Sequence, residues 1–153
     1  MKQILLVVAA VVFGSASPAQ EAPVLVTPDD VKWADAPPSL PSGAKATLLF
    51  GNPANPGPFI LRLKMPANYK ISPHFHPDTE TVTVLSGAFS VSMGDAFDAA
   101  KAKSMPAGSF IAVPAKSPHF AFTKEETVIQ VNAVGPWSIT YVNPADDPRN
   151  SKK

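Results

Sequence analysis

The sequence of 153 residues contains no cysteine. This absence excludes disulfide bonds, thiolate catalysis, cysteine-ligated zinc and a lipid anchor on an N-terminal cysteine. Histidine is scarce, with three residues in the whole chain. Charged residues make up only 16% of the chain, well below the usual proportion of about a quarter, whereas 45% of the residues are hydrophobic. The composition therefore predicts a globular protein and not a disordered one.

The sequence also lacks an excess of either charge. It has 13 basic and 12 acidic residues, and Lys2 belongs to a predicted leader, which leaves 12 of each. No basic stripe follows any predicted element, and this argues against nucleic acid or an anionic membrane as a partner. The expected partner is a small-molecule substrate or ligand.

The N-terminus is typical of an export signal. Lys2 precedes an apolar run at residues 4–13, and small residues follow at 14–19. The run is about half the ~20 residues that a membrane span requires, so a cleaved signal peptide is favoured over an anchor. Residues 1–19 are the predicted signal peptide, with cleavage after Ala19. The mature protein is expected to be periplasmic or secreted, without a membrane span.

The sequence contains 18 prolines and eight glycines. This favours short strands and tight turns over long helices. Residues 20–45 are predicted to form an extended arm anchored by Trp33, residues 46–143 a single β-barrel, and residues 144–153 a polar, mobile tail. Residues 95–104 read as a loop or one helical turn. The predicted strands cover residues 46–50, 59–65, 69–76, 79–85, 88–93, 110–113, 119–123, 127–133 and 137–142.

All three histidines fall in one pattern. His74, His76 and Glu80 form an HxHxxxE motif, and His119 follows downstream. Alternating side chains on a strand put His74 and His76 on one face, while a bend after His76 starts the strand that carries Glu80. A chance match to this motif has odds of roughly one in a thousand in this chain. Because imidazole and carboxylate are metal ligands, the pattern predicts one metal site.

Two segments resemble the motifs of the cupin superfamily. The first is His74-x-His76-x3-Glu80-x6-Gly87, and the second is Gly108-x5-Pro114-x4-His119. The resemblance covers about residues 46–133. It implies an all-β fold, the double-stranded β-helix (jelly-roll) cupin barrel, with a metal near one mouth. The ligands that it implies are His74, His76, Glu80 and His119.

Three positions depart from the family pattern. Asn68 and Lys116 stand where the family usually has glycine, and Thr123 stands where it often has asparagine. Asn68 and Thr123 concern the backbone and the surroundings of the site, so the metal ligands are unaffected. Lys116 could place a positive charge beside an anionic substrate, although a solvated turn lysine is the favoured interpretation.

The ligand set limits the metal without choosing it. Three imidazoles and one carboxylate suit a divalent transition metal, which could be Fe, Mn, Ni, Cu, Zn or Co. Four protein ligands would leave one or two coordination positions for water, dioxygen or a substrate oxygen. The alternative is a set of buried polar groups bonded to one another, but cupins without a metal usually lack ligands as well.

Three further residues are candidates for the pocket. Gln130 and Asn132 share one face of an apolar strand, and that face either meets the cavity or faces solvent. Tyr69 is a candidate cavity phenol, although a core or rim position is favoured. Phe120 and Phe122 point away from His119 and are predicted to pack between the two sheets.

The favoured function is a metal-dependent oxidoreductase, dioxygenase-like, acting on a small oxygen-bearing substrate. Glu80 would serve as ligand and as catalytic base, as the resemblance suggests. An isomerase or lyase, or a non-enzymatic module that binds a small ligand or a metal, is the alternative. Sensor cupins of the anti-sigma type carry a separate partner-binding domain, and no segment here is predicted to form one. A homodimer is expected, with residues 23–44 as the exchanged arm.

Overall fold

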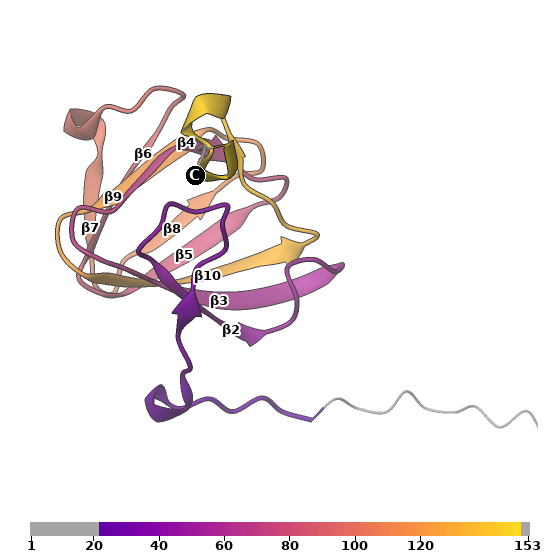
Figure 1. Cartoon of the computed structure of the whole chain (residues 1–153). Coiled ribbons are helices and arrows are strands. Elements are labelled where there is room, and N and C mark those ends of the chain that lie inside the picture. Colours follow the sequence, from indigo (N-terminus) through magenta and orange to yellow (C-terminus); the bar gives the residue numbers. More distant parts are fainter. Residues whose placement is uncertain (1–21, 151–153) are drawn as a thin grey trace, which may run out of the picture.

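Two antiparallel sheets face each other and form a barrel (Figure 1). The computed structural model describes residues 22–150. A six-stranded sheet has the order β1-β2-β3-β10-β5-β8, and a five-stranded sheet has the order β11-β4-β9-β6-β7. The strands are β1 (Ala34–Asp35), β2 (Lys45–Phe50), β3 (Gly57–Met65), β4 (Lys70–Phe75), β5 (Glu80–Ser86), β6 (Ala88–Met93), β7 (Lys103–Pro106), β8 (Phe110–Val113), β9 (His119–Thr123), β10 (Thr127–Gly135) and β11 (Thr140–Tyr141).

The all-β jelly-roll prediction is confirmed. The described residues contain no α-helix; their helical turns are the 3-10 elements η1 (Pro28–Asp30), η2 (Ala99–Lys101), η3 (Pro144–Asp146) and η4 (Pro148–Asn150). The sequence did not predict β7, because Lys103 and its neighbours lack the alternating apolar pattern of a strand. The strand predicted at 137–142 is reduced to β11, and Arg149 ties the C-terminal turns to the Ile139 carbonyl at 3.1 Å.

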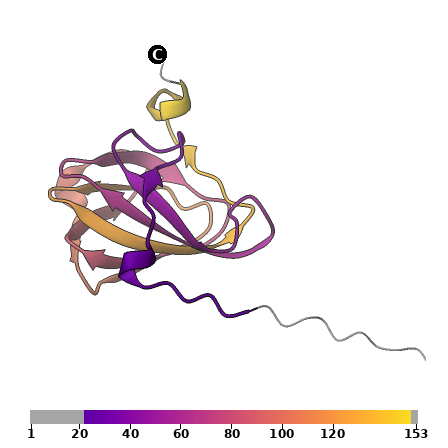
Figure 2. The same cartoon turned by 60° about the horizontal axis from the view of Figure 1, so that its bottom comes forward.

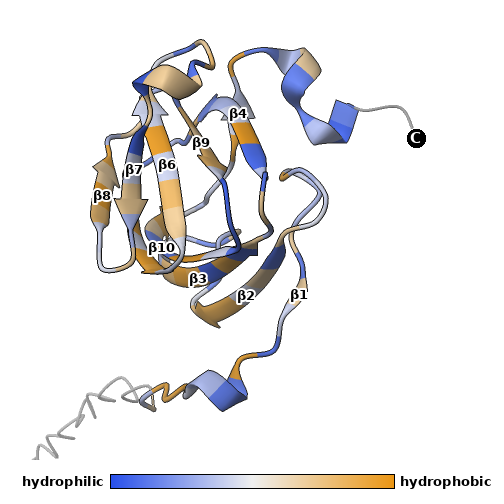
Figure 3. Ribbon diagram, turned by 90° about the vertical axis from the view of Figure 1, so that its left-hand side faces the viewer, coloured by the Kyte–Doolittle hydropathy of each residue, from blue (hydrophilic) through white to orange (hydrophobic). Residues whose placement is uncertain are grey.

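The core lies between the sheets. Strand β3 turns Leu61, Leu63 and Met65 inward, and β10 does the same with Ile129 and Val131, as period-two alternation requires. Hydrophobic colouring follows the strands in Figure 3, whereas the C-terminal turns are largely hydrophilic.

The prediction that Phe120 and Phe122 pack between the sheets is wrong. The inward positions of β9 belong to His119 and Ala121, so the two phenylalanines face the outer side. There Phe97, from the loop after β6, covers them with ring centroids 4.7 and 5.8 Å away.

A β-bulge in β4 aims the first histidine. Ile71 pairs with Ala121 and His74 with His119, so three steps along β4 match two along β9. Pro73 lies inside this bulge, where a residue without an N–H group disturbs the ladder least. The extra residue explains why Ile71 and His74 both reach the interior despite their odd spacing.

The N-terminal segment leaves the barrel and then returns across its mouth. Residues 22–30 are exposed and lie away from the body, as Figures 1 and 2 show. Trp33 contacts the body, with Lys64 Nζ 4.9 Å from its ring centroid. Residues 37–43, here called the strap, follow β1. Buried Tyr69 and Tyr141 donate their hydroxyl hydrogen bonds to the Pro41 and Ser39 carbonyls of the strap. Two core phenols therefore fix the strap in place.

The signal-peptide prediction concerns residues 1–19, which lie outside the described residues. Within residues 22–150 no helix is long and apolar enough to cross a bilayer.

The backbone at residues 68 and 116 explains why the cupin pattern usually has glycine at these two positions. Asn68 and Lys116 have φ values of 61° and 59°, which place both in the left-handed region. Glycine adopts that region without strain, whereas a lysine there costs about 1–2 kcal/mol. The Lys116 N–H nevertheless donates to the His76 carbonyl at 2.8 Å, so this turn buttresses the site.

We expect Gly87→Ala to destabilise the fold far more than Gly108→Ala. Both glycines have positive φ, 71° and 86°. A Cβ at Gly87 would lie 2.4 Å from the Glu126 carbonyl oxygen, whereas one at Gly108 meets nothing within 4 Å. Urea unfolding should show a loss of about 2–4 kcal/mol for Gly87→Ala and about 1 kcal/mol or less for Gly108→Ala. Equal losses would contradict the backbone clash.

Candidate metal centre

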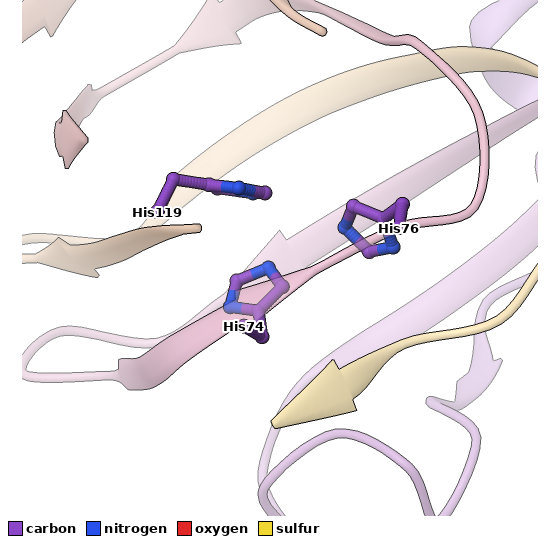
Figure 4. Close-up of side chains that lie close together, drawn as sticks. All are labelled: His74, His76 and His119. Atoms are coloured by element: carbon purple, nitrogen blue, oxygen red, sulfur yellow. The ribbon is translucent and has the colours of Figure 1, made fainter. Parts of the chain in front are cut away.

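Three histidines meet at one end of the barrel interior (Figure 4). His74 on β4 lies directly opposite His119 on β9 in the antiparallel register, with ring centroids 4.2 Å apart. His76 lies one residue beyond β4, and its ring centroid is 5.0 Å from that of His74 and 5.4 Å from that of His119. Glu80 approaches from the other sheet as the first residue of β5. The site therefore spans both sheets.

Each imidazole is oriented by a backbone carbonyl behind it. The Nδ1 atoms of His74, His76 and His119 lie 2.7, 2.8 and 3.1 Å from the carbonyl oxygens of Ser72, Ser138 and Ser117 respectively. A carbonyl oxygen only accepts, so each Nδ1 carries the proton and donates. Every Nε2 is consequently unprotonated in the neutral ring, which is the form that binds a metal.

The donor set fits a divalent metal ion. One nitrogen from each of the three buried histidines can be chosen so that all three lie within 4.8 Å of one another. The Nε2 atom of His76 is buried and has no hydrogen-bond partner among the described residues. An unpartnered buried acceptor costs free energy, and an ion bound at the three nitrogens would satisfy it.

Glu80 lies at ligand-to-ligand distance from two of the histidines. Its carboxylate oxygens are 3.8 Å from His76 Nε2 and 3.5 Å from His119 Nε2. Both distances exceed an ordinary hydrogen bond. They match the roughly 3–4 Å that separates two atoms each bound about 2.0–2.2 Å from one ion. The Glu80 side chain is 13% exposed, against 7% for His76 and 4% for His119.

Burial keeps two of the rings neutral. Desolvation lowers the pKa of His74 well below its usual value, and the neighbouring His119 and His76 rings lower it further. Desolvation also lowers the pKa of His76, against the opposing effect of Glu80. Neutral imidazole is the metal-binding state, so burial prepares both residues as ligands.

Trp137 supports His76 by stacking on its ring. The two rings stack with centroids 4.3 Å apart at 16°, and buried Phe59 packs its ring 5.6 Å behind Trp137. The next residue, Ser138, supplies the carbonyl that orients His76. The sequence predicted only a strand over residues 137–142. The contact of Trp137 with the site depends on how the chain turns before β11.

The three pocket candidates do not line the cavity. Gln130 and Asn132 lie on the outer face of β10, where Gln130 accepts a hydrogen bond from Arg62 Nε at 3.2 Å. Tyr69 is buried and bonded to the strap. Lys116 is exposed in the turn beside His76. Among the residues predicted for the site, the structure brings together His74, His76, Glu80 and His119.

A cavity of about 400 Å³ opens from the histidines into the barrel. Both sheets contribute walls, and residues of the strap and Trp137 stand at its margin. An ion held by the histidines would therefore face an internal chamber large enough for a small molecule.

A family model identifies most of the chain. The model for the ChrR cupin-like domain matches residues 21–138, which include all four candidate ligands. No curated protein sequence matches the chain.

Solved structures share the fold at low sequence identity. The polyketide cyclase RemF from Streptomyces resistomycificus superposes with a TM-score of 0.68 at 20% identity, covering 81% of this chain and 88% of its own. An acetylacetone dioxygenase from Acinetobacter johnsonii gives 0.65 at 14% identity, with 88% and 87% covered.

The anti-sigma factor ChrR of Rhodobacter sphaeroides, in complex with SigE, gives a TM-score of 0.52 at 16% identity, with 70% of this chain and 50% of the other covered. At these identities the likeness establishes the fold alone. Together with the family match and the two motifs, it shows that the chain belongs to the ChrR cupin-like domain family of the cupin superfamily.

Proposed function

We propose that the protein is a metal-dependent oxidoreductase of the dioxygenase type that acts on a small oxygen-bearing substrate. The observation that carries this proposal is the convergence of three oriented histidines and Glu80 on the end of an internal cavity. His74, His76, His119 and Glu80 would hold a divalent metal, which supplies Lewis-acid or oxygen-activating chemistry when bound. The fold shared with an acetylacetone dioxygenase supports this class of reaction.

The chain's own residues orient the substrate and accept a proton. The apolar walls exclude water, which strengthens electrostatic interactions at the site. Glu80 lines the cavity, so its carboxylate can accept a proton from a substrate hydroxyl or enol. Dioxygen would be the oxidant, and both its atoms would end in the oxidised product, so no external reductant is required.

Oxygen uptake tests the proposal. The protein loaded separately with Fe, Mn, Ni or Cu is incubated with phenols, β-diketones and thiol acids, and metal-free protein serves as the control. We expect one metal form to consume one dioxygen per substrate. No oxygen uptake with any metal and substrate of the panel would contradict the dioxygenase. Substrate turnover that proceeds equally without oxygen would indicate an isomerase or lyase.

A non-enzymatic module is the second candidate. Its support is the match to the ChrR cupin-like domain and the shared fold with an anti-sigma factor solved in complex with SigE. In that case a small ligand or the metal itself would be the signal. A ligand that is recovered with the purified protein and is never converted would favour this function.

We also propose that the mature protein is exported and forms a homodimer. Residues 22–30 extend from the body, and Leu25 among them is 86% exposed. Strand β1 pairs only with Lys45 and Ala46, so within the described residues the outer edge of 47–50 lacks a partner strand. A second copy would cover both features. A sedimentation experiment that shows only monomer would exclude the dimer. Export by this leader would be excluded if protein purified from its native cell kept an uncleaved N-terminus.

A further inference from the structure

The cavity behind the histidines has one polar end. His74, His76, His119 and Glu80 are its titratable lining residues, and all four belong to the candidate metal centre. No lysine or arginine is among the described residues that line it. The other polar side chains of the lining are those of Ser39, Thr47 and Ser138, together with the indole N–H of Trp137. The remaining lining is apolar.

The apolar walls come from both sheets and from the strap. Leu61 and Val131 contribute from one sheet and Ile71 and Phe89 from the other, while Leu40 closes the chamber from the strap. These walls offer a ligand no charge and few hydrogen-bond partners. A sugar or a polyanion placed here would lose its hydration without compensation, at a large free-energy cost. A hydrocarbon body would instead gain from burial.

We propose that the cavity takes a neutral, largely hydrocarbon molecule whose single polar end meets the histidines and Glu80. This inference rests on the proposed function, because that function places a metal at the polar end. The volume of about 400 Å³ falls at the lower end of the range of roughly 300–1,000 Å³ that holds drug-sized ligands. The ligand is therefore a small monomeric compound and not a polymer segment.

Alkyl hydroxamic acids are suitable probes, because they are neutral and present two adjacent oxygens at one end of a hydrocarbon chain. Binding to the zinc-loaded protein is measured by calorimetry, in the absence of turnover. We expect Kd to fall about three- to fourfold with each added methylene until the chamber is filled. A hydroxamic acid of equal chain length that carries a carboxylate at its far end should bind at least about tenfold more weakly, because that charge would be buried in the apolar chamber. Affinity independent of chain length, or equal affinity for the carboxylate probe, would overturn the proposal.

A specificity swap tests the wall directly. Leu61→Lys places a cation in the chamber. It should reverse the preference between the two probes, so that the probe with the terminal carboxylate binds more tightly than the plain alkyl hydroxamic acid. Leu85→Lys is the matched control, since Leu85 is 40% exposed and does not line the cavity; its preference should equal that of the parent. If Leu61→Lys fails to fold, Leu40→Ala in the strap should instead lengthen the best-bound chain. A folded Leu61→Lys variant with an unchanged probe preference would overturn the proposal. So would a Leu40→Ala variant whose best-bound chain length is unchanged.

The failure of this inference can be distinguished from failure of the proposed function. If no substrate consumes oxygen but hydroxamate affinity still rises with chain length, the ligand class stands and the reaction does not. If hydroxamates bind equally well to metal-free protein, the polar end does not meet the metal centre and the ligand assignment is wrong. Zinc content is determined on each sample before the titration.

Discussion

Replacing His119 with alanine is expected to lower the metal content of the protein from about one ion per chain to below about a tenth. His119 supplies one of three buried nitrogens and faces His74 across the strand pair at 4.2 Å between ring centroids. Its loss leaves two imidazoles and a partly exposed carboxylate, which is too few ligands for a stable site. The measurement is elemental analysis after dialysis against a weak chelator, and His76→Ala should give the same result.

Tyr141→Phe is the matched control for this loss. The Tyr141 ring lies 5.9 Å from that of His74, but its hydroxyl donates to the strap and offers no ligand. This variant should keep its metal. The parent protein should also unfold at a higher temperature with saturating metal than without it, whereas the histidine variants should not respond. Unchanged metal content in His76→Ala, in a protein that still folds, would show that the ligand assignment is wrong.

Glu80→Gln is expected to lower the rate of oxygen uptake about 100-fold or more while much of the metal is retained. The amide has nearly the same shape as the carboxylate but cannot accept a proton at neutral pH, and the three histidines remain in place. Oxygen consumption and metal content are measured on the same preparation. Full activity would remove Glu80 from the role of base.

Glu126→Gln provides the comparison for Glu80→Gln. Glu126 is exposed in the turn before β10, so the same chemical change there should leave both readouts at the parent level. If Glu80→Gln loses the metal together with the activity, Glu80 is required to retain the ion, and its part as a ligand accounts for the loss. Glu80→Asp keeps the charge but shortens the side chain by one methylene. It therefore distinguishes the effect of the carboxylate's position from the effect of its charge.

The sequence predicted the part of the site that local spacing controls. His74 and His76 are two residues apart, and a bend brings Glu80 back toward them, so their approach follows from the alternation of strand side chains. His119 was expected on another strand across the sheet. It lies on the neighbouring strand β9 of the same sheet, directly opposite His74. The sequence did not show which strand this would be, because the pairing of β4 with β9 joins residues far apart in the chain.

The surroundings of the site could not be predicted in the same way. The bulge at Pro73, the Trp137 ring on His76 and the strap over the cavity all depend on tertiary contacts. Period-two alternation places Gln130 and Asn132 on a common face of the strand but does not say whether that face points inward or outward. The pairing of β10 with β3 and β5 decides that their neighbours Ile129 and Val131 face inward. Local rules thus predict the ligands, whereas the walls follow from how the sheets assemble.

The strap has a consequence for how this protein could diversify. It forms part of the cavity wall but lies outside the β-strands that carry the metal ligands and the core. Two tyrosine hydroxyls hold it by backbone carbonyls, so this attachment places no demand on the side chains of residues 39 and 41. Substitutions at Ser39 and Leu40, which line the cavity, can therefore reshape the chamber while the tyrosine hydrogen bonds to the strap backbone are kept. Related chains could share one reaction centre and yet select different molecules through this short segment.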